Sequence, residues 1–156
     1  YPAESLKLSV DDSFLYVSYQ KEYFISIRLI SREYPKYQSV IPNKTTYGLQ
    51  VDKNALLNAV KRIRILANEK THGIKCSLKN NLLTLSTNHP SLGEAKEEIS
   101  VKYEGKDFNI GFNAKYLMDN LSVLNDTEIT LEFNNELSPV VVKCSEMKDF
   151  LGIIMP

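Results

Sequence analysis

The sequence has no excess of charge of either sign and no long apolar run. Its 156 residues include 19 basic and 19 acidic side chains, so any contact with nucleic acid must come from local placement of charge. No apolar stretch approaches the roughly 20 residues that a membrane-spanning helix needs, and no basic-then-apolar signal sequence opens the chain. These absences predict a soluble, cytoplasmic protein.

Motifs for catalysis are also missing. The six glycines stand singly, which argues against a phosphate-binding glycine loop, and there is neither a nucleophile elbow nor a helical His-Glu-x-x-His pattern. Cys76 and Cys144 lie in strand-like runs without motif spacing, which favours two buried reduced thiols over a disulfide. We therefore expect no enzymatic activity, no cofactor and no metal.

Two sets of polar residues, a pair of histidines and the acids of residues 94–98, allow a weaker hypothesis of enzymatic activity. A hairpin turning at Asn80 and Asn81 would make His72 and His89 cross-strand partners. Two imidazoles could hold a metal for a hydrolase, but no carboxylate or thiol completes a tetrahedral set, and two surface histidines are the simpler interpretation. The acids of residues 94–98 fall on both faces of a strand, which favours a solvated edge strand over a catalytic carboxylate pair.

The strongest local pattern is an amphipathic helix over residues 52–68. Asp52 is a good N-cap, and Asn68 is expected to end the helix. Its core-facing stripe consists of five apolar residues, Leu56, Ala59, Val60, Ile63 and Ala67. Its four basic residues are Lys53, Lys61, Arg62 and Arg64. No acid occurs between Asp52 and Glu69, so the outer face is cationic, either as an ordinary solvated surface or as a surface for phosphates.

A second stretch repeats this unit. When residue 52 is shifted onto residue 113, Asn113 aligns with Asp52 as a cap, and Leu117 and Leu121 align with Leu56 and Val60. Short alternating strands at 47–51 and 108–112 precede the two helices. Further strands are expected at 73–79, 82–88 and 94–103 after the first helix and at 127–133, 140–144 and 150–155 after the second. Residues 134–135 are expected to turn the hairpin that corresponds to the one at Asn80 and Asn81. The sequence therefore predicts an α+β fold of duplicated strand-helix-three-strand units, with two helices packed on antiparallel sheets.

The first part of the chain has a different organisation. Strands are expected at 6–10, 14–19 and 23–30, without a helix of their own. A connector with Pro35 and Pro42 follows, in which each proline favours extended geometry for the residue before it.

Four motifs in order give the chain a family resemblance. They are Tyr34-Pro-Lys-Tyr37, Leu66-Ala-Asn-Glu-Lys70, Ile110-Gly-Phe-Asn-Ala-Lys-Tyr116 and Ile153-Ile-Met-Pro156. With them the chain resembles the bacterial DNA polymerase III beta subunits, the sliding clamps, over essentially its whole length. The resemblance implies a DNA-clamp fold in which residues 1–45 are the end of the second clamp domain with its connector and residues 46–156 are the third domain. The first domain would be absent, so the resemblance implies a fragment.

The resemblance also implies a function. Clamps of this family are rings of two subunits that encircle duplex DNA and act as processivity factors for the replicative polymerase. The residues that would face DNA are Lys53, Lys61, Arg62, Arg64 and Lys115. Ile65 and Leu66 would meet the first domain of the other subunit, so we expect that a chain lacking its own first domain cannot close a ring.

Family members bind polymerase, clamp loader and repair proteins through a pocket that accepts a short apolar peptide. Carried over by position, the pocket would comprise Pro35, Val40, Asn113, Tyr116, Leu137, Pro139, Ile153, Ile154, Met155 and Pro156. Ser39 stands where the family often has Arg, and Thr71 where an aromatic residue can occur. The alternative is a protein-protein adaptor that uses the edge at 153–156 and never encircles DNA.

Overall fold

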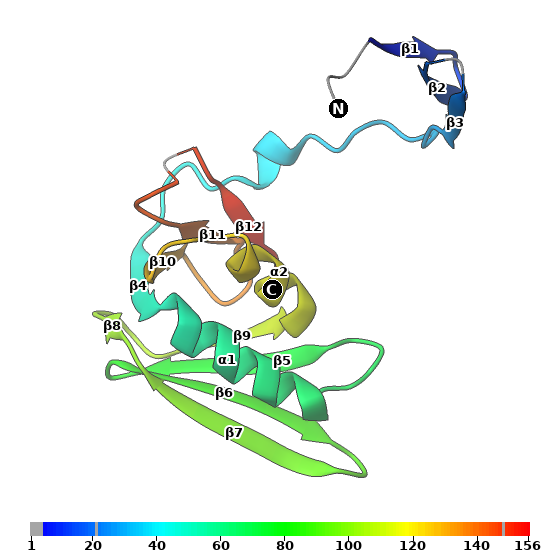
Figure 1. Cartoon of the computed structure of the whole chain (residues 1–156). Helices are drawn as coiled ribbons and strands as arrows, with labels where there is room; N and C mark the ends of the chain where they lie inside the picture. Colours follow the sequence, from blue (N-terminus) through cyan, green and yellow to red (C-terminus); the bar gives the residue numbers. More distant parts are fainter. Residues whose placement is uncertain (1–4, 21, 148) are drawn as a thin grey trace. The chain divides into compact units, whose positions relative to one another are not determined.

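The computed structural model describes residues 5–20, 22–147 and 149–156 (Figure 1). The chain divides into two compact units, residues 1–36 and 37–156. The connecting segment contains a short 3-10 helix, η1 (Tyr37–Val40). No helix in the described ranges is both long and apolar enough to cross a membrane.

The first unit is an antiparallel three-stranded sheet of β1 (Leu6–Val10), β2 (Phe14–Tyr19) and β3 (Tyr23–Arg28). Asp11 fixes the first turn, because its Oδ1 accepts hydrogen bonds from the backbone N–H groups of Ser13 at 2.8 Å and Phe14 at 2.7 Å. The first two strands match their predicted ranges. The third ends at Arg28, two residues before its predicted end at 30, and the backbone N–H of Leu29 bonds back to Ser13 O at 2.7 Å instead.

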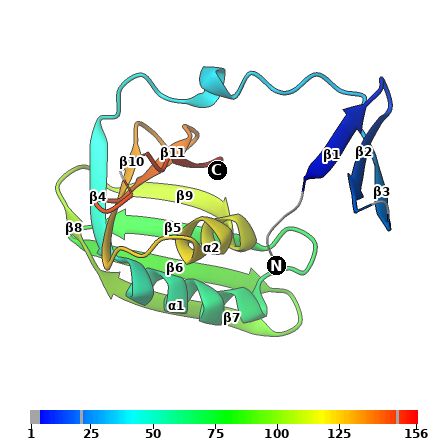
Figure 2. The same cartoon turned by 45° about the horizontal axis from the view of Figure 1, so that its top comes forward.

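The second unit contains the predicted repeat (Figure 2). The first copy consists of β4 (Tyr47–Asp52), α1 (Lys53–Ile63), β5 (Gly73–Lys79), β6 (Leu82–His89) and β7 (Gly93–Ser100). The second copy consists of β9 (Phe108–Asn113), α2 (Ala114–Ser122), β10 (Glu128–Phe133), β11 (Val140–Lys143) and β12 (Gly152–Ile154). Both N-caps are formed as predicted: Asp52 Oδ1 accepts from Ala55 N at 2.7 Å and Asn113 Oδ1 from Lys115 N at 2.9 Å.

The two copies exchange strands when they form sheets. β9, from the second copy, completes a four-stranded sheet in the order β7-β6-β5-β9, and β4, from the first copy, enters a five-stranded sheet in the order β12-β11-β10-β4-β8. The predicted strand at 94–103 is broken at Val101, whose N–H donates to Asn81 O at 2.9 Å, and its last part forms β8 (Lys102–Tyr103) beside β4. β7 is an edge strand, as its scattered acids predicted.

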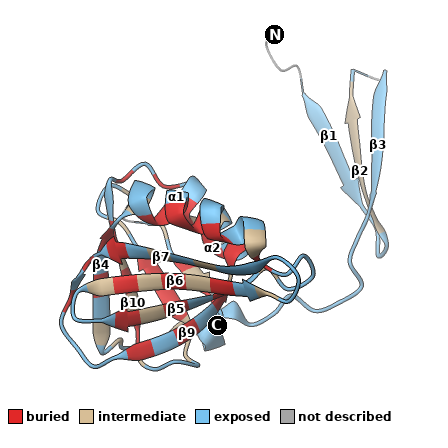
Figure 3. Ribbon diagram, turned by 90° about the horizontal axis from the view of Figure 1, so that it is seen from below, coloured by how far each residue is buried: buried red, intermediate tan, exposed pale blue. Residues whose placement is uncertain are grey.

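Helices α1 and α2 lie side by side against the sheets (Figures 1 and 2). Their apolar stripes are buried as predicted, and buried residues concentrate between the helices and the strands (Figure 3). The first helix ends earlier than predicted: after Ile63 it tightens into the 3-10 helix η2 (Arg64–Leu66), and Ala67 is extended. Asn68 instead organises the following loop, where its Oδ1 accepts from Lys70 N at 2.9 Å and Thr71 N at 3.2 Å.

The hairpin turns differ between the copies. Asn80 and Asn81 have φ angles of 49° and 61°, as expected for a tight turn between β5 and β6. The corresponding connection between β10 and β11 covers residues 134–139 and is held by Ser138, whose Oγ accepts from Asn134 N at 3.1 Å and Asn135 N at 3.0 Å. The two cysteines are separate thiols; Cys76 is buried, and that burial raises its pKa to about 12.

Candidate functional site

The basic residues of α1 and α2 differ in their surroundings. Lys53 is half-buried, and its Nζ donates to the backbone oxygen of Leu124 at 3.0 Å, just after α2 ends. Arg62 forms a bidentate ion pair with Glu97 of the edge strand β7, and one of the two bonds, from Nη2 to Oε2, measures 2.6 Å. That hydrogen-bonded pairing lowers the pKa of Glu97 and raises the pKa of Arg62. The charge of Arg62 is therefore largely compensated.

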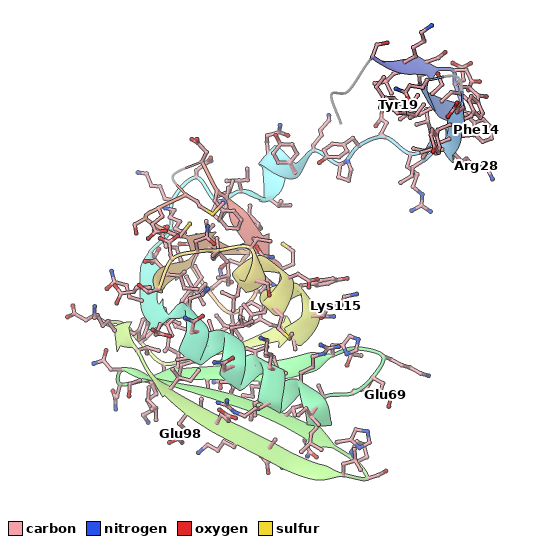
Figure 4. The ribbon with its side chains drawn as sticks, in the orientation of Figure 1. Phe14, Tyr19, Arg28, Glu69, Glu98 and Lys115 are labelled. Atoms are coloured by element: carbon pink, nitrogen blue, oxygen red, sulfur yellow. The ribbon has the colours of Figure 1, made fainter. Side chains whose placement is uncertain are left out.

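The other cations are more available. Arg64 is exposed, and its Nη1 lies 3.9 Å from the sulfur of Met118 on α2. Lys61 and Lys115 are exposed and take no part in the ion pairs of the described residues. Figure 4 shows the Lys115 side chain projecting from α2. Of the five basic residues named from the sequence, these three present charge to solvent most directly.

The residues expected at a subunit interface follow α1. Ile65 is 77% exposed in η2, although it is a large aliphatic residue, and Leu66 beside it is half-buried. The side chain of Ile65 is therefore an exposed apolar group on an otherwise polar surface.

An open groove of about 960 Å³ crosses the outer face of the four-stranded sheet. Leu137, Met155 and Pro156 give it an apolar side, and Asn113 lies at the end of β9. Four of the ten pocket residues expected from the sequence are therefore brought together in one groove. The groove is mixed in character, with these three apolar residues on one side and polar side chains along the rest, so it could hold the apolar anchors and the polar backbone of a short peptide.

The other expected pocket residues are placed differently. Tyr116 is 59% exposed on α2, and Val40 is exposed in η1. Pro139 and Ile153 are half-buried outside the groove lining, whereas Ile154 is 2% exposed and belongs to the core. Pro35 lies in the other compact unit.

Most of the hydrogen-bonding groups of the Asn113 side chain already have partners. Its Oδ1 accepts the N-terminal amides of α2, and its Nδ2 donates to Thr71 O at 3.0 Å. One N–H of the carboxamide is left for a ligand, because an amide nitrogen carries two hydrogens. The cap and the loop contact hold this side chain in place at the rim of the groove.

Several groove residues were not identified from the sequence. Lys75, Ser86, Asn88 and Gly111 lie on the outer faces of β5, β6 and β9 and line the same groove. Their strands alternate between buried and exposed positions, so the period of two could have indicated this face, although not which part of it is hollow. In the described residues no cluster of three potential metal ligands occurs, and the pairing of β5 with β6 begins at Lys75 and Ser86, short of His72.

Comparisons with known proteins agree with this architecture. Residues 38–156 match the family model described as DNA polymerase III beta subunit, C-terminal domain. The beta sliding clamp of Pseudomonas aeruginosa is 33% identical over 86% of this chain and 37% of its own length, and that of Treponema pallidum is 31% identical over 99% and 43%. A crystal structure of the P. aeruginosa clamp bound to griselimycin is 29% identical, with a TM-score of 0.78 over 97% of this chain and 41% of that one.

The chain thus spans about two fifths of the length of these relatives. The duplicated units, the strand exchange between the sheets and the paired helices are the DNA-clamp fold of the solved relatives. With a family model covering residues 38–156, the chain belongs to the DNA polymerase III beta subunit family, the bacterial sliding clamps.

Proposed function

We propose that this chain is part of a ring-shaped processivity factor that encircles duplex DNA and tethers the replicative polymerase. The main support is the pair of helices α1 and α2, one from each copy of the repeat, with Lys61 and Lys115 exposed on them. A cationic face on α1, with the exposed Lys115 on the neighbouring α2, has no role in a simple adaptor. The proposed site of action is the cytoplasm, and the role is one of binding rather than catalysis.

The proposed mechanism is topological. A closed ring threaded on duplex DNA cannot dissociate sideways, so a polymerase attached to it stays on its template. Exposed cations attract phosphates without reading bases, and counterion-mediated contacts of this kind leave the ring free to slide. Lys61, Arg64 and Lys115 are the first candidates for these contacts, whereas Lys53 and Arg62 position other parts of the protein.

The proposed ring has two subunits. In it, residues 1–45 complete the second domain of a subunit and residues 46–156 form the third. The exposed Ile65, with Leu66, would be covered by the first domain of the other subunit.

The proposed partner site is the groove at Asn113, Leu137, Met155 and Pro156. It would receive the short apolar motif of polymerase, clamp loader and repair proteins. Binding of griselimycin by the P. aeruginosa relative supports the idea that clamps of this family have a site for such ligands. An adaptor that uses this groove without encircling DNA is the second candidate function.

The first prediction separates a ring from an adaptor. The full-length protein is loaded onto circular and linear duplex DNA, and the fraction retained is measured as salt is raised. A threaded ring should remain on circles and be lost from linear DNA, because phosphate contacts alone weaken steeply with salt on both templates. Equal loss from both templates would favour the adaptor.

Charge reversal tests the phosphate contacts separately. The double variant Lys61→Glu, Lys115→Glu should bind linear duplex more weakly at low salt. The slope of log affinity against log salt should fall by about 2, roughly one for each lost phosphate contact. A matched variant reverses the exposed Lys7 and Lys44 instead and should keep the slope of the parent. An unchanged slope in the first variant would remove these two lysines from the DNA surface.

The next prediction concerns the partner site. Griselimycin should bind the chain, and Tyr116→Ala should weaken its binding about tenfold, because the exposed Tyr116 stands three residues after the groove residue Asn113 and a tyrosine beside a peptide site is a common anchor. Isothermal titration calorimetry measures the affinity. Tyr23→Ala, which removes another exposed ring from a different unit, is the control. Equal affinities for the parent and Tyr116→Ala would exclude Tyr116 from the site.

A further inference from the structure

One edge of the four-stranded sheet is open to an added strand. β9 is the terminal strand, paired with β5 on one side only. The backbone N–H of Asn109 donates to Glu136 Oε1 at 3.0 Å, in the loop between β10 and β11, so this amide points away from β5. In an antiparallel strand the direction of the backbone groups alternates, so the N–H and C=O of Gly111 point to the same open edge.

The surroundings of Gly111 leave room for a ligand. A Cβ built on this glycine would point to the outer face of the sheet and would meet no atom within 4 Å, so that face is open next to the edge. Within the described ranges, neither its N–H nor its C=O takes part in a hydrogen bond outside the sheet. Gly111 also lines the groove that contains Leu137, Met155 and Pro156. An extended peptide bound at those apolar residues could therefore continue along the edge of β9.

A charge lies beside this edge. Lys75 of β5 is the cross-strand neighbour of Gly111 and lines the same groove. It is exposed and takes no part in the ion pairs of the described chain, whereas the strand lysines Lys79, Lys96 and Lys102 each have an acidic partner. Two acids also line the groove: Glu136, already bonded to Asn109, and Glu94 on the more distant β7. A carboxylate on an added segment would find its counter-ion in Lys75.

We propose that β9 binds an extended, acidic segment of a partner protein by strand addition. The main-chain groups of the segment bond to Gly111, and a carboxylate of the segment pairs with Lys75. This inference rests on the proposed partner-binding function, because the segment continues from a short apolar motif held at Leu137, Met155 and Pro156. Main-chain bonds give affinity in this mode of recognition, and the side chains beside the strand give specificity.

Glu136 limits the length of the added strand. Its carboxylate already occupies the N–H of Asn109, as an edge-covering side chain does in sheets that avoid aggregation. The added segment therefore starts at Gly111 and ends before Asn109, unless Glu136 moves away. Partner proteins that carry acidic residues beside the apolar motif would therefore bind more tightly than those that carry the motif alone.

The test compares three peptides by calorimetry. One is a short peptide containing leucine and phenylalanine; the others carry the extension Thr-Val-Glu-Val-Thr at its N-terminus or at its C-terminus. One extended peptide should bind about tenfold more tightly than the short one, which corresponds to one or two net hydrogen bonds and an exposed ion pair.

Three variants identify the contacts. Gly111→Pro removes the edge N–H and should abolish the gain from the extension. Gly111→Ala places a Cβ in the same open space but keeps the N–H, so it should retain the gain. Lys75→Glu should also lose the gain with this extension and recover it when the extension carries lysine in place of glutamate.

The outcomes separate the two levels of the proposal. If the short peptide binds and neither extension adds affinity, the strand-addition inference is wrong and the apolar partner site stands. The same holds if Gly111→Pro keeps the full gain. If no peptide binds, the proposed partner site fails, and the inference that rests on it fails with it.

Discussion

Replacing Phe133 by alanine should cost about 3–5 kcal/mol of unfolding free energy, the range found for a buried phenylalanine. Phe133 ends β10 and is 2% exposed. Its ring lies 5.1 Å from that of Phe108, edge to face, and 5.9 Å from that of Tyr47, centroid to centroid. These rings come from both copies of the repeat, so the cavity would open where the two sheets share their core. A domain stable by about 5–15 kcal/mol would lose a large part of its stability.

Urea denaturation measures this effect. The sequence contains no tryptophan, so tyrosine fluorescence reports the transition, and Tyr47 and Tyr103 lie next to the substituted ring. Leu137→Ala is the control, because Leu137 is 86% exposed and its truncation should change stability by less than about 0.5 kcal/mol. A Phe133→Ala protein within about 1 kcal/mol of the parent would show that this aromatic cluster does not hold the sheets together.

The features predicted correctly from the sequence are those set by neighbouring residues. Asp52 and Asn113 cap their helices through amides two or three residues along the chain. Asn80 and Asn81 adopt positive φ within their own turn. The apolar stripe of each helix follows from its period alone. Such features need no knowledge of the rest of the fold, so a sequence is sufficient to identify them.

The missed features depend on contacts between distant residues. Asn81 breaks the strand at 94–103, because its backbone oxygen accepts from Val101 N and its side-chain oxygen accepts from Tyr103 N at 2.7 Å. The pairing of β9 with β5 and of β4 with β10 crosses between the two copies, so each sheet contains strands of both copies. Alternating patterns identify strands but not their neighbours.

The candidate site shows the same division. Counting charges indicates that α1 has a cationic face, but the pairing of Arg62 with Glu97 requires α1 and β7 to be adjacent. The family resemblance predicts that Asn113, Met155 and Pro156 belong to one site, and these three residues do line one groove. The open edge at Gly111 has no sequence signal, because it depends on which strand ends the sheet.

A second large effect is expected at Asp126, which joins two loops. Its Oδ1 accepts from Ser145 N at 2.7 Å, Ser145 Oγ at 2.9 Å and Glu146 N at 2.9 Å, and the residue is 2% exposed. Asp126→Ala removes the charged acceptor of three hydrogen bonds from the exposed residues Ser145 and Glu146, and hydrogen bonds to a charged group are the stronger ones. We expect the Tm to fall by roughly 5 °C. Because the loop it anchors leads into β12, which ends next to Met155 of the proposed groove, ligand binding in that groove should weaken as well.

The pH dependence of stability tests whether the negative charge of Asp126 causes this stabilisation. The hydrogen bond from Glu146 N–H, with those from Ser145, holds the pKa of the Asp126 carboxyl below its ordinary value, against the desolvation that raises it. A lowered folded-state pKa stabilises the protein above the unfolded pKa of about 4, and this stabilisation is lost as the pH falls through the lower, folded-state value.

Asp126→Asn keeps one acceptor oxygen but cannot titrate. The stability difference between the parent and Asp126→Asn should therefore be constant near neutral pH and shrink below about pH 4. Other carboxylates with lowered pKa values, such as Glu97 and Glu132, titrate in both proteins and cancel in that difference. A difference that stays constant down to low pH would mean that Asp126 acts through its shape and not through its charge.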